Sequence, residues 1–156
     1  KKSKSGIIVK GLYDVAVHFS KCCSPVPGDE IVGFVTRGRG VSIHRTDCIN
    51  IINLSDMERE RLIDAEWQHD EESGEAGLYL AEIKVFCNNR TGLLVDITKI
   101  FTEREIDINA IHSKTSKQGI ATIDISFNTR GKAELSSLID KLRQIDSIID
   151  IERTTG

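Results

Sequence analysis

The sequence lacks a long apolar run, a signal peptide and a strong net charge. No apolar stretch approaches the roughly 20 residues that a helix needs to cross a bilayer, and no apolar core follows the basic start KKSKSG. We therefore expect a cytoplasmic protein with no membrane partner. The chain also begins without Met, as we would expect of a segment cut from a longer protein.

The net charge of only −3 hides a difference between the two ends of the chain. Residues 1–54 hold eight Lys or Arg against four Asp or Glu, a net charge of +4, whereas residues 70–156 hold eleven against fifteen, a net charge of −4. A polyanion such as RNA is attracted to a basic surface. Charge therefore gives weak support for a nucleic-acid contact in the first part of the chain and none in the second.

What the sequence does contain is the composition of a soluble globular protein, with 39% hydrophobic and 29% charged residues. Its 156 residues suffice for one large domain or two small ones. The segment HDEESGEAG at 69–77 is acidic, contains two glycines and interrupts the apolar periodicity. We predict that it links a domain at 1–68 to a domain at 78–156.

The first domain is predicted to consist of short strands joined by tight turns. Apolar and β-branched segments between Pro and Gly turns predict strands over residues 6–10, 31–36, 41–44 and 61–67. The turn RGRG at 37–40 joins two of these strands into a hairpin with a basic tip. Thr46 and Asp47 are candidates to cap a short helix that ends at Asn53.

The second domain follows a clearer pattern. Alternation of apolar and polar residues, with the turns between them, predicts strands over 81–87, 106–113, 121–127 and 147–153. Apolar residues at helical spacing predict helices over 93–101 and 135–142. The order β-α-β-β-α-β predicts a ferredoxin-like α+β fold.

The stretch from residue 21 to residue 48 gathers four potential metal ligands: Cys22, Cys23, His44 and Cys48. Thiolate and imidazole are the ligands of structural zinc sites. The adjacent cysteines are awkward, because neighbouring side chains of a strand point to opposite faces. Only a tight turn leading into Ser24 and Pro25 could aim both thiols at one ion. His18 is a substitute ligand if one cysteine points away.

Three other interpretations of this cluster stay open. Two of the cysteines could form a disulfide, or all could be small buried thiols beside a hydrogen-bonded histidine. A cysteine nucleophile paired with His44 is the third, but no residue at a readable spacing supplies an orienting group or an oxyanion site. Cys87 is different, because it lies on the apolar face of a predicted strand and is expected to belong to the core.

The run CCSPVPGDEIVGFVTRGRGVSIHRTDC at 22–48 resembles the conserved-cysteine, zinc-finger-like domain of the long RelA/SpoT-type enzymes. The domain at 78–156 resembles the ACT, or RRM-like, domain that ends those proteins. Both patterns occur in the order of the family and together cover nearly the whole chain. The resemblance therefore implies the regulatory C-terminal region of a (p)ppGpp synthetase/hydrolase, also called a GTP pyrophosphokinase.

The resemblance implies a parent enzyme, a GTP diphosphokinase that transfers pyrophosphate from ATP to GTP or GDP and in some relatives also hydrolyses the product. Its catalytic domains lie upstream, and these residues contain neither a P-loop nor an HD-type metal motif. We expect no enzyme activity from this chain. In the stringent response, the family's region senses amino-acid starvation by docking on the ribosome with uncharged tRNA in the A site, and it controls the catalytic domains.

The zinc ligands of the family correspond to Cys22, Cys23, His44 and Cys48, although some relatives lose ligands and keep the fold without Zn²⁺. The family domain also contacts ribosomal RNA. We assign that contact to four basic residues: Lys21, Arg37, Arg39 and Arg45. Two arginines on a glycine-flanked tip can reach phosphates in a fork geometry, and the alternative is an ordinary solvated turn.

ACT domains often bind amino acids at the loop after their first strand and across an interface. The matching residues here are Asn88, Arg90, Thr91, Gly92, Leu93, Leu94 and Asn109. N–H groups at a helix N-terminus could hold a carboxylate, and the alternative is a plain strand–helix turn. Tyr79 and Phe86 are the only aromatic residues expected near the sheet, so base stacking is disfavoured. The second candidate function is therefore an amino-acid-binding, homodimeric allosteric ACT module.

Overall fold

The computed structural model describes residues 6–10, 15–68 and 77–154. Contacts within the chain divide it into two compact units, with the boundary between Gly77 and Leu78. Apart from Gly77, the predicted linker lies outside the described residues. Among the described residues, no helix is both long enough and apolar enough to cross a membrane.

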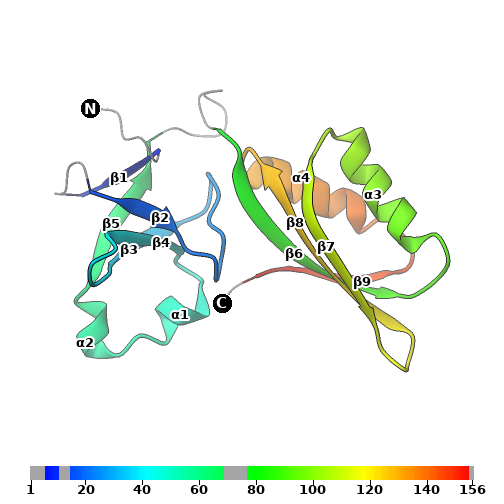
Figure 1. Ribbon diagram of the computed structural model, residues 1–156, viewed down its shortest axis with the longest axis horizontal. Coiled ribbons are helices and arrows are strands. Elements are labelled where there is room, and N and C mark those ends of the chain that lie inside the picture. The colour runs from blue at the N-terminus through cyan, green and yellow to red at the C-terminus, as the bar shows by residue number, and fades with distance from the viewer. Residues whose placement is uncertain (1–5, 11–14, 69–76, 155–156) are drawn as a thin grey trace. The chain divides into compact units, whose positions relative to one another are not determined.

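The first unit is built on a five-stranded sheet with the order β1-β5-β3-β4-β2 (Figure 1). The strands are β1 (Ile7–Val9), β2 (Val17–Phe19), β3 (Ile31–Val35), β4 (Val41–Arg45) and β5 (Leu62–Trp67). Strand β2 runs parallel to β4, and the other neighbouring strands are antiparallel. The β-rich prediction for this domain is therefore confirmed, and β2 is a strand that the sequence did not reveal.

Alternating side chains give the two faces of this sheet different roles. Ile43 belongs to an apolar core, in which the buried residues are Ile7, Val9, Val41 and Ile43. The next residue of β4, His44, points to the opposite face. There Val32, which pairs with His44 across the sheet, packs in a smaller cluster with Cys23, Cys48 and Ile51. One face therefore holds the main core, and the other holds the sulfur-bearing residues.

Two one-turn helices follow β4. They are α1 (Ile49–Ile52) and α2 (Asp56–Arg59). The predicted cap of the first helix was wrong: its N-cap is Cys48, which makes no side-chain capping hydrogen bond, and the side chain of Asp47 pairs with Arg45. The second helix was not predicted, although the spacing of Ser55 and Glu58 is that of a capping box, and the structure contains that box.

The hairpin between β3 and β4 is fixed by a close backbone approach at Gly40. The N–H of Val41 donates to the carbonyl of Ala16 at 2.8 Å, where the chain enters β2. A Cβ atom on Gly40 would fall on that same carbonyl oxygen, and Gly40 also has a φ of +75°. Only glycine combines that conformation with that space, so Gly40 anchors the base of the hairpin to β2.

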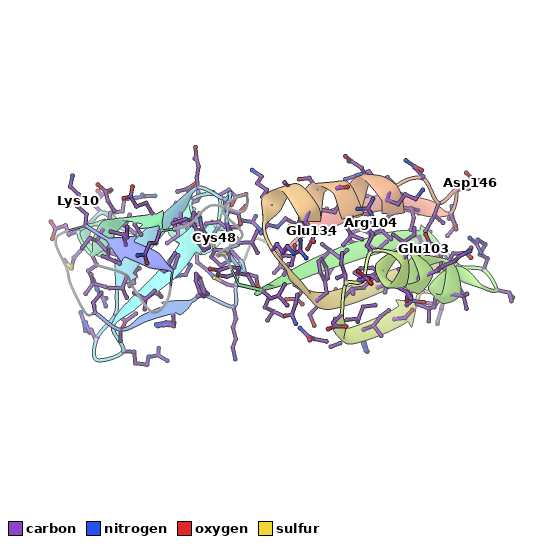
Figure 2. The ribbon with its side chains drawn as sticks, turned by 90° about the horizontal axis from the view of Figure 1, so that it is seen from above. Lys10, Cys48, Glu103, Arg104, Glu134 and Asp146 are labelled. Carbon is purple, nitrogen blue, oxygen red and sulfur yellow. The ribbon has the colours of Figure 1, made fainter. Side chains whose placement is uncertain are left out.

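The second unit has the predicted β-α-β-β-α-β order, with a four-stranded sheet in the order β7-β8-β6-β9. Its elements are β6 (Tyr79–Asn88), α3 (Leu93–Glu103), β7 (Ile108–Thr115), β8 (Ile120–Thr129), α4 (Lys132–Leu142) and β9 (Ile148–Arg153). Both helices lie against one face of the sheet (Figure 1). Arg104, just after α3, donates to Ser137 on α4 at 2.9 Å where the two helices lie side by side (Figure 2). The ferredoxin-like prediction is confirmed.

Strict alternation builds the core of this second unit. Every other residue of β8 is buried, and Phe127 packs edge-to-face against Phe101 of α3 with ring centroids 5.2 Å apart. Cys87 is fully buried, as expected of a core residue. Each large apolar side chain buried in this way stabilises the fold by about 1.5–3 kcal/mol, so the packing of the two helices on the sheet is the main source of stability in this unit.

Candidate metal centre and basic hairpin

Three separate segments bring the predicted metal ligands together. Cys22 and Cys23 lie in the turn after β2, His44 lies in β4, and Cys48 is the residue before α1, where Figure 2 labels it. Their four ligand atoms all lie within 4.8 Å of one another. In a tetrahedral site with Zn–S bonds of about 2.3 Å, neighbouring sulfurs are about 3.8 Å apart. The observed spacing therefore fits one zinc-sized ion.

Individual distances support this fit. The Sγ atom of Cys22 lies 3.4 Å from the Sγ of Cys48 and 3.4 Å from the Nδ1 of His44. The Sγ of Cys23 lies 4.0 Å from the same nitrogen. His18, the substitute ligand, is not part of the group. The four residues named from the sequence are those that converge.

A turn solves the problem of the adjacent cysteines. The chain leaves its extended path after β2, and the N–H of Ser24 donates to the carbonyl of Ser20 at 3.0 Å. Ser24 has a φ of +46°, in the left-handed region, which costs a non-glycine residue about 1–2 kcal/mol. The turn at residues 21–23 takes the two cysteines out of the strand geometry, in which neighbouring side chains would point to opposite faces.

Neighbouring polar groups orient the ligands. The Nε2 of His44 lies 3.1 Å from the hydroxyl of Ser42, which leaves Nδ1 directed at the thiols. The hydroxyl of Ser20 lies 2.8 Å from the Sγ of Cys22. Metal-binding histidines usually carry such a partner on their second nitrogen, so the surroundings also match a metal centre.

The protonation of the cluster follows from burial and hydrogen bonding. Burial raises the pKa of the Cys23 thiol far above its usual value, and it raises the pKa of Cys48 as well. Burial also acts on Cys22, but hydrogen bonds from Ser20 and Asn50 outweigh it and lower the pKa of that thiol. Burial lowers the pKa of His44, so its imidazole is neutral near pH 7 and able to bind a cation.

Arg45 takes no part in the basic surface predicted for RNA. Its side chain is only 5% exposed and makes two hydrogen bonds, at 2.8 and 2.9 Å, to the carboxylate of Asp47. It also donates to the carbonyl of Cys23 at 3.2 Å, while its own N–H donates to the Sγ of Cys23 at 3.3 Å. The guanidinium therefore holds the cysteine turn, and the assignment of Arg45 to phosphate contact is corrected.

The other three basic residues are exposed. Arg37 and Arg39 lie at the tip of the β3–β4 hairpin, and Lys21 precedes the cysteine turn. Within the described part of the chain, neither arginine has an ion-pair partner. The tip is held by Thr36, which donates from its hydroxyl to the carbonyl of Gly40 at 2.6 Å and accepts from the N–H of Arg39 at 3.2 Å. The two guanidinium groups are free to meet an anion.

In the second unit, the predicted ligand loop joins β6 to α3. Gly92 begins the helix with a φ of +81°, while Leu93 is buried beneath it. The side chain of Arg90 is engaged within the domain: it donates to the hydroxyl of Ser147 at 3.0 Å and to the carboxylate of Asp96 at 2.6 Å. A ligand carboxylate would have to displace these contacts, whereas Asn88, Thr91 and Leu94 are exposed.

Asn109 does not join this loop within one chain. Its neighbour Ile108 pairs with Phe127, which in turn pairs with Ala81, whereas Asn88 pairs with Ile120. Seven residues of β6 separate the two positions, or about 24 Å along the strand. The side chain of Asn109 instead donates to Asn128 at 3.2 Å. The predicted set is therefore split between opposite ends of the sheet.

The comparisons with known proteins match both units. Residues 7–68 match the family model described as the RelA/SpoT RIS domain, and residues 75–153 match the one described as the ACT domain. The GTP pyrophosphokinase of Escherichia coli K12 is 38% identical over 99% of this chain and 20% of its own length. The GTP pyrophosphokinase of Streptomyces coelicolor is 37% identical over 97% of the chain and 17% of its own length.

Among solved structures, the NMR structure of the ACT domain from the GTP pyrophosphokinase of Chlorobium tepidum is 25% identical, with a TM-score of 0.45. It covers 51% of this chain and 89% of its own. The chain spans about a fifth of the length of the two curated relatives. The ACT domain model matches half of the residues, so the chain belongs to the ACT domain family. A RelA/SpoT RIS domain precedes its ACT domain.

Proposed function

We propose that this chain is the non-catalytic regulatory region of a stringent-response (p)ppGpp synthetase, a GTP pyrophosphokinase. In this proposal it docks on ribosomal RNA when uncharged tRNA occupies the A site, and it controls catalytic domains upstream. The observation that carries the proposal is the exposed pair Arg37 and Arg39 on a hairpin with a rigid base. Identity to the GTP pyrophosphokinases over nearly the whole chain supports the choice of parent enzyme.

The metal centre would make the RIS domain rigid. Cys22, Cys23, His44 and Cys48 would hold Zn²⁺, which supplies a cross-link between three segments of the chain. Strand β4 carries His44 near one end and joins the hairpin tip at the other, where Gly40 locks it to β2. A fixed β4 keeps the two arginines in one place, which lowers the entropy lost when they bind.

RNA is the partner that this tip fits best. The tip has two planar guanidinium groups separated by Gly38, at which a Cβ atom would meet nothing within 4 Å. Arginine binds phosphate through two parallel hydrogen bonds, and contacts of this kind position a protein on nucleic acid without reading its sequence. The exposed Lys21 adds a third positive charge to the same domain.

The test is co-sedimentation of the 156-residue chain with ribosomes over a range of salt concentrations. The double substitution R37E/R39E should weaken binding at least tenfold and flatten its salt dependence, because phosphate contacts release counterions. The matched control is K117E/K132E, which reverses two exposed charges in the ACT domain and should bind like the parent chain. Equal binding by all three proteins would contradict the assignment of the RNA contact.

A dimeric, amino-acid-binding ACT module is the second candidate. It is favoured by β7, an edge strand in which residues 109–115 are all exposed, because an unpaired edge can add a strand from a second copy. The engagement of Arg90 by Asp96 and Ser147 makes the ligand part of this candidate the weaker one. Calorimetry with a panel of amino acids separates the two candidates: heat with one amino acid and no ribosome binding would favour the second.

A further inference from the structure

Two thiols of the cluster are placed to react with each other. The sulfurs of Cys22 and Cys48 lie 3.4 Å apart, and a disulfide requires about 2.05 Å, so they need to approach by only about 1.4 Å. The two residues are separated by 26 positions in the sequence and come from a turn and a helix N-cap. Such a bond would join two segments that the fold already holds together.

The surroundings single out this pair among the three cysteines. Cys22 is partly exposed, whereas Cys23 and Cys48 are buried, so a small oxidant reaches Cys22 first. The Sγ of Cys23 accepts the N–H of Arg45 at 3.3 Å, and its carbonyl accepts the guanidinium of the same residue. The Sγ of Cys23 also hydrogen-bonds to both other thiols, but the contacts with Arg45 hold it against β4, and Cys48 is the residue whose sulfur lies 3.4 Å from that of Cys22.

From this geometry, we propose that the RIS domain contains an oxidation site at which hydrogen peroxide converts Cys22 and Cys48 into a disulfide when no metal is bound. The sulfur of Cys22 attacks the peroxide, the O–O bond breaks, and a sulfenic acid and one water form. The sulfur of Cys48 then attacks that sulfenic sulfur, the S–O bond breaks, and its proton leaves with the hydroxyl as a second water. The two thiols lose two electrons, which reduce one peroxide.

The disulfide and the metal exclude each other. The bond uses two of the four ligand atoms that lie within 4.8 Å, which leaves Cys23 and His44, too few for a structural zinc site. Bound Zn²⁺, in turn, would occupy both sulfurs and shield them from peroxide. The cluster would therefore have two alternative cross-linked forms: a zinc-bound form under reducing conditions and a Cys22–Cys48 disulfide under oxidising conditions.

The test is peptide mapping of the whole 156-residue chain. Metal is removed with a chelator, the protein is treated with one equivalent of hydrogen peroxide, and free thiols are alkylated before digestion. We expect a peptide that joins Cys22 to Cys48, a loss of two hydrogens per chain, and alkylated Cys23 and Cys87. Zinc-loaded protein should form the bond at least tenfold more slowly. Oxidised protein should bind no zinc until dithiothreitol restores it.

Three variants make the test specific. C22S and C48S should each abolish the internal disulfide, whereas the matched variant C23S should still form it. A bond between Cys22 and Cys23, a bond between Cys23 and Cys48, or oxidation of Cys22 beyond the sulfenic acid without a disulfide would each overturn the proposal. If a variant fails to fold, mapping of the unsubstituted chain still distinguishes these outcomes, because the cross-linked peptide identifies both cysteines.

The oxidation site stands apart from the proposed ribosome docking. The bond is read by mass and zinc content, neither of which involves RNA. If R37E/R39E bound ribosomes normally, the docking proposal would fail while the disulfide stayed testable. If no disulfide formed, docking through the basic hairpin would be unaffected.

Discussion

The two domains of this chain achieve stability in different ways. Among the described residues, nine of the twelve largest fully buried side chains lie in the ACT domain and three, Val26, Val41 and Ile43, lie in the RIS domain. The RIS domain instead concentrates its buried polar contacts around the cysteines and Arg45. A small domain with a limited apolar core needs a further cross-link. We therefore expect the stability of the RIS domain to depend on a metal and that of the ACT domain to be independent of it.

The single tryptophan makes this comparison measurable. Trp67 lies in β5 of the RIS domain, stacks on Phe19 with ring centroids 5.7 Å apart and donates to the carbonyl of Asp29 at 3.1 Å. Its fluorescence therefore reports unfolding of the RIS domain alone, whereas circular dichroism reports both domains.

The largest effect is expected from the core of the ACT domain. F127A removes a fully buried ring that packs against Phe101, which should lower the free energy of unfolding of that domain by about 3–5 kcal/mol. Denaturation should show an earlier transition by circular dichroism with the Trp67 transition unchanged. A shift of the Trp67 transition by the same amount would show that the two domains unfold as one.

Removal of zinc should destabilise the RIS domain and leave the ACT domain unchanged. If the RIS domain binds Zn²⁺ at a free concentration a thousandfold above the Kd, chelation should cost it about 4 kcal/mol. The Trp67 transition should move to lower denaturant, while the ACT domain is unaffected. Elemental analysis should first find about one zinc per chain. If the RIS domain were equally stable without metal, its predicted dependence on zinc would be wrong.

Arg45 tests whether the polar contacts around the cysteines matter. R45M keeps much of the buried side-chain volume but leaves the carbonyl of Cys23 without that donor, at a cost of about 2 kcal/mol to the RIS domain. It should also weaken zinc binding at least tenfold, because the cysteine turn loses its support. The matched control is R39M, at the exposed hairpin tip, which should change neither quantity.

The smallest effect is expected at the capping box of α2. Ser55 accepts the N–H of Glu58 at 3.2 Å, and its own N–H donates to the Glu58 carboxylate at 3.1 Å. S55A should destabilise the RIS domain by about 1 kcal/mol, seen as a shift of the Trp67 transition. S136A, on the exposed side of α4, should leave that transition where it is.

Secondary structure was predicted best where apolar residues recur at one regular spacing along a whole strand or helix. The alternation in β8 and the helical spacing in α3 were sufficient to predict the ACT domain, because one face of each element is buried throughout. Strand β2 was missed because nothing in its three residues indicates the pairing with β4 that makes them a strand. Its pairing with β4 depends on the contact between Gly40 and Ala16, which is remote in sequence.

The four ligands of the candidate metal site were predicted from the sequence, but the residues that support them were not. The four ligands were named from residue type and spacing, yet the left-handed conformation of Ser24, which closes the cysteine turn, has no sequence signature. Arg45 was taken as a surface residue because arginines usually are, and only its contacts with Asp47 and Cys23 reveal otherwise. Asn109 lies on the second strand of the ACT domain as predicted, but the pattern of the sequence did not show that it lies at the opposite end of the sheet from the loop after β6.

The glycine at the base of the hairpin has a consequence for engineering. Any side chain at position 40 would collide with the backbone of Ala16, whereas positions 37 and 39 are exposed. A library that keeps Gly40 and randomises those two positions would thus sample new chemistries on an unchanged scaffold. The hairpin therefore holds two positions that tolerate variation within three residues of one that tolerates none.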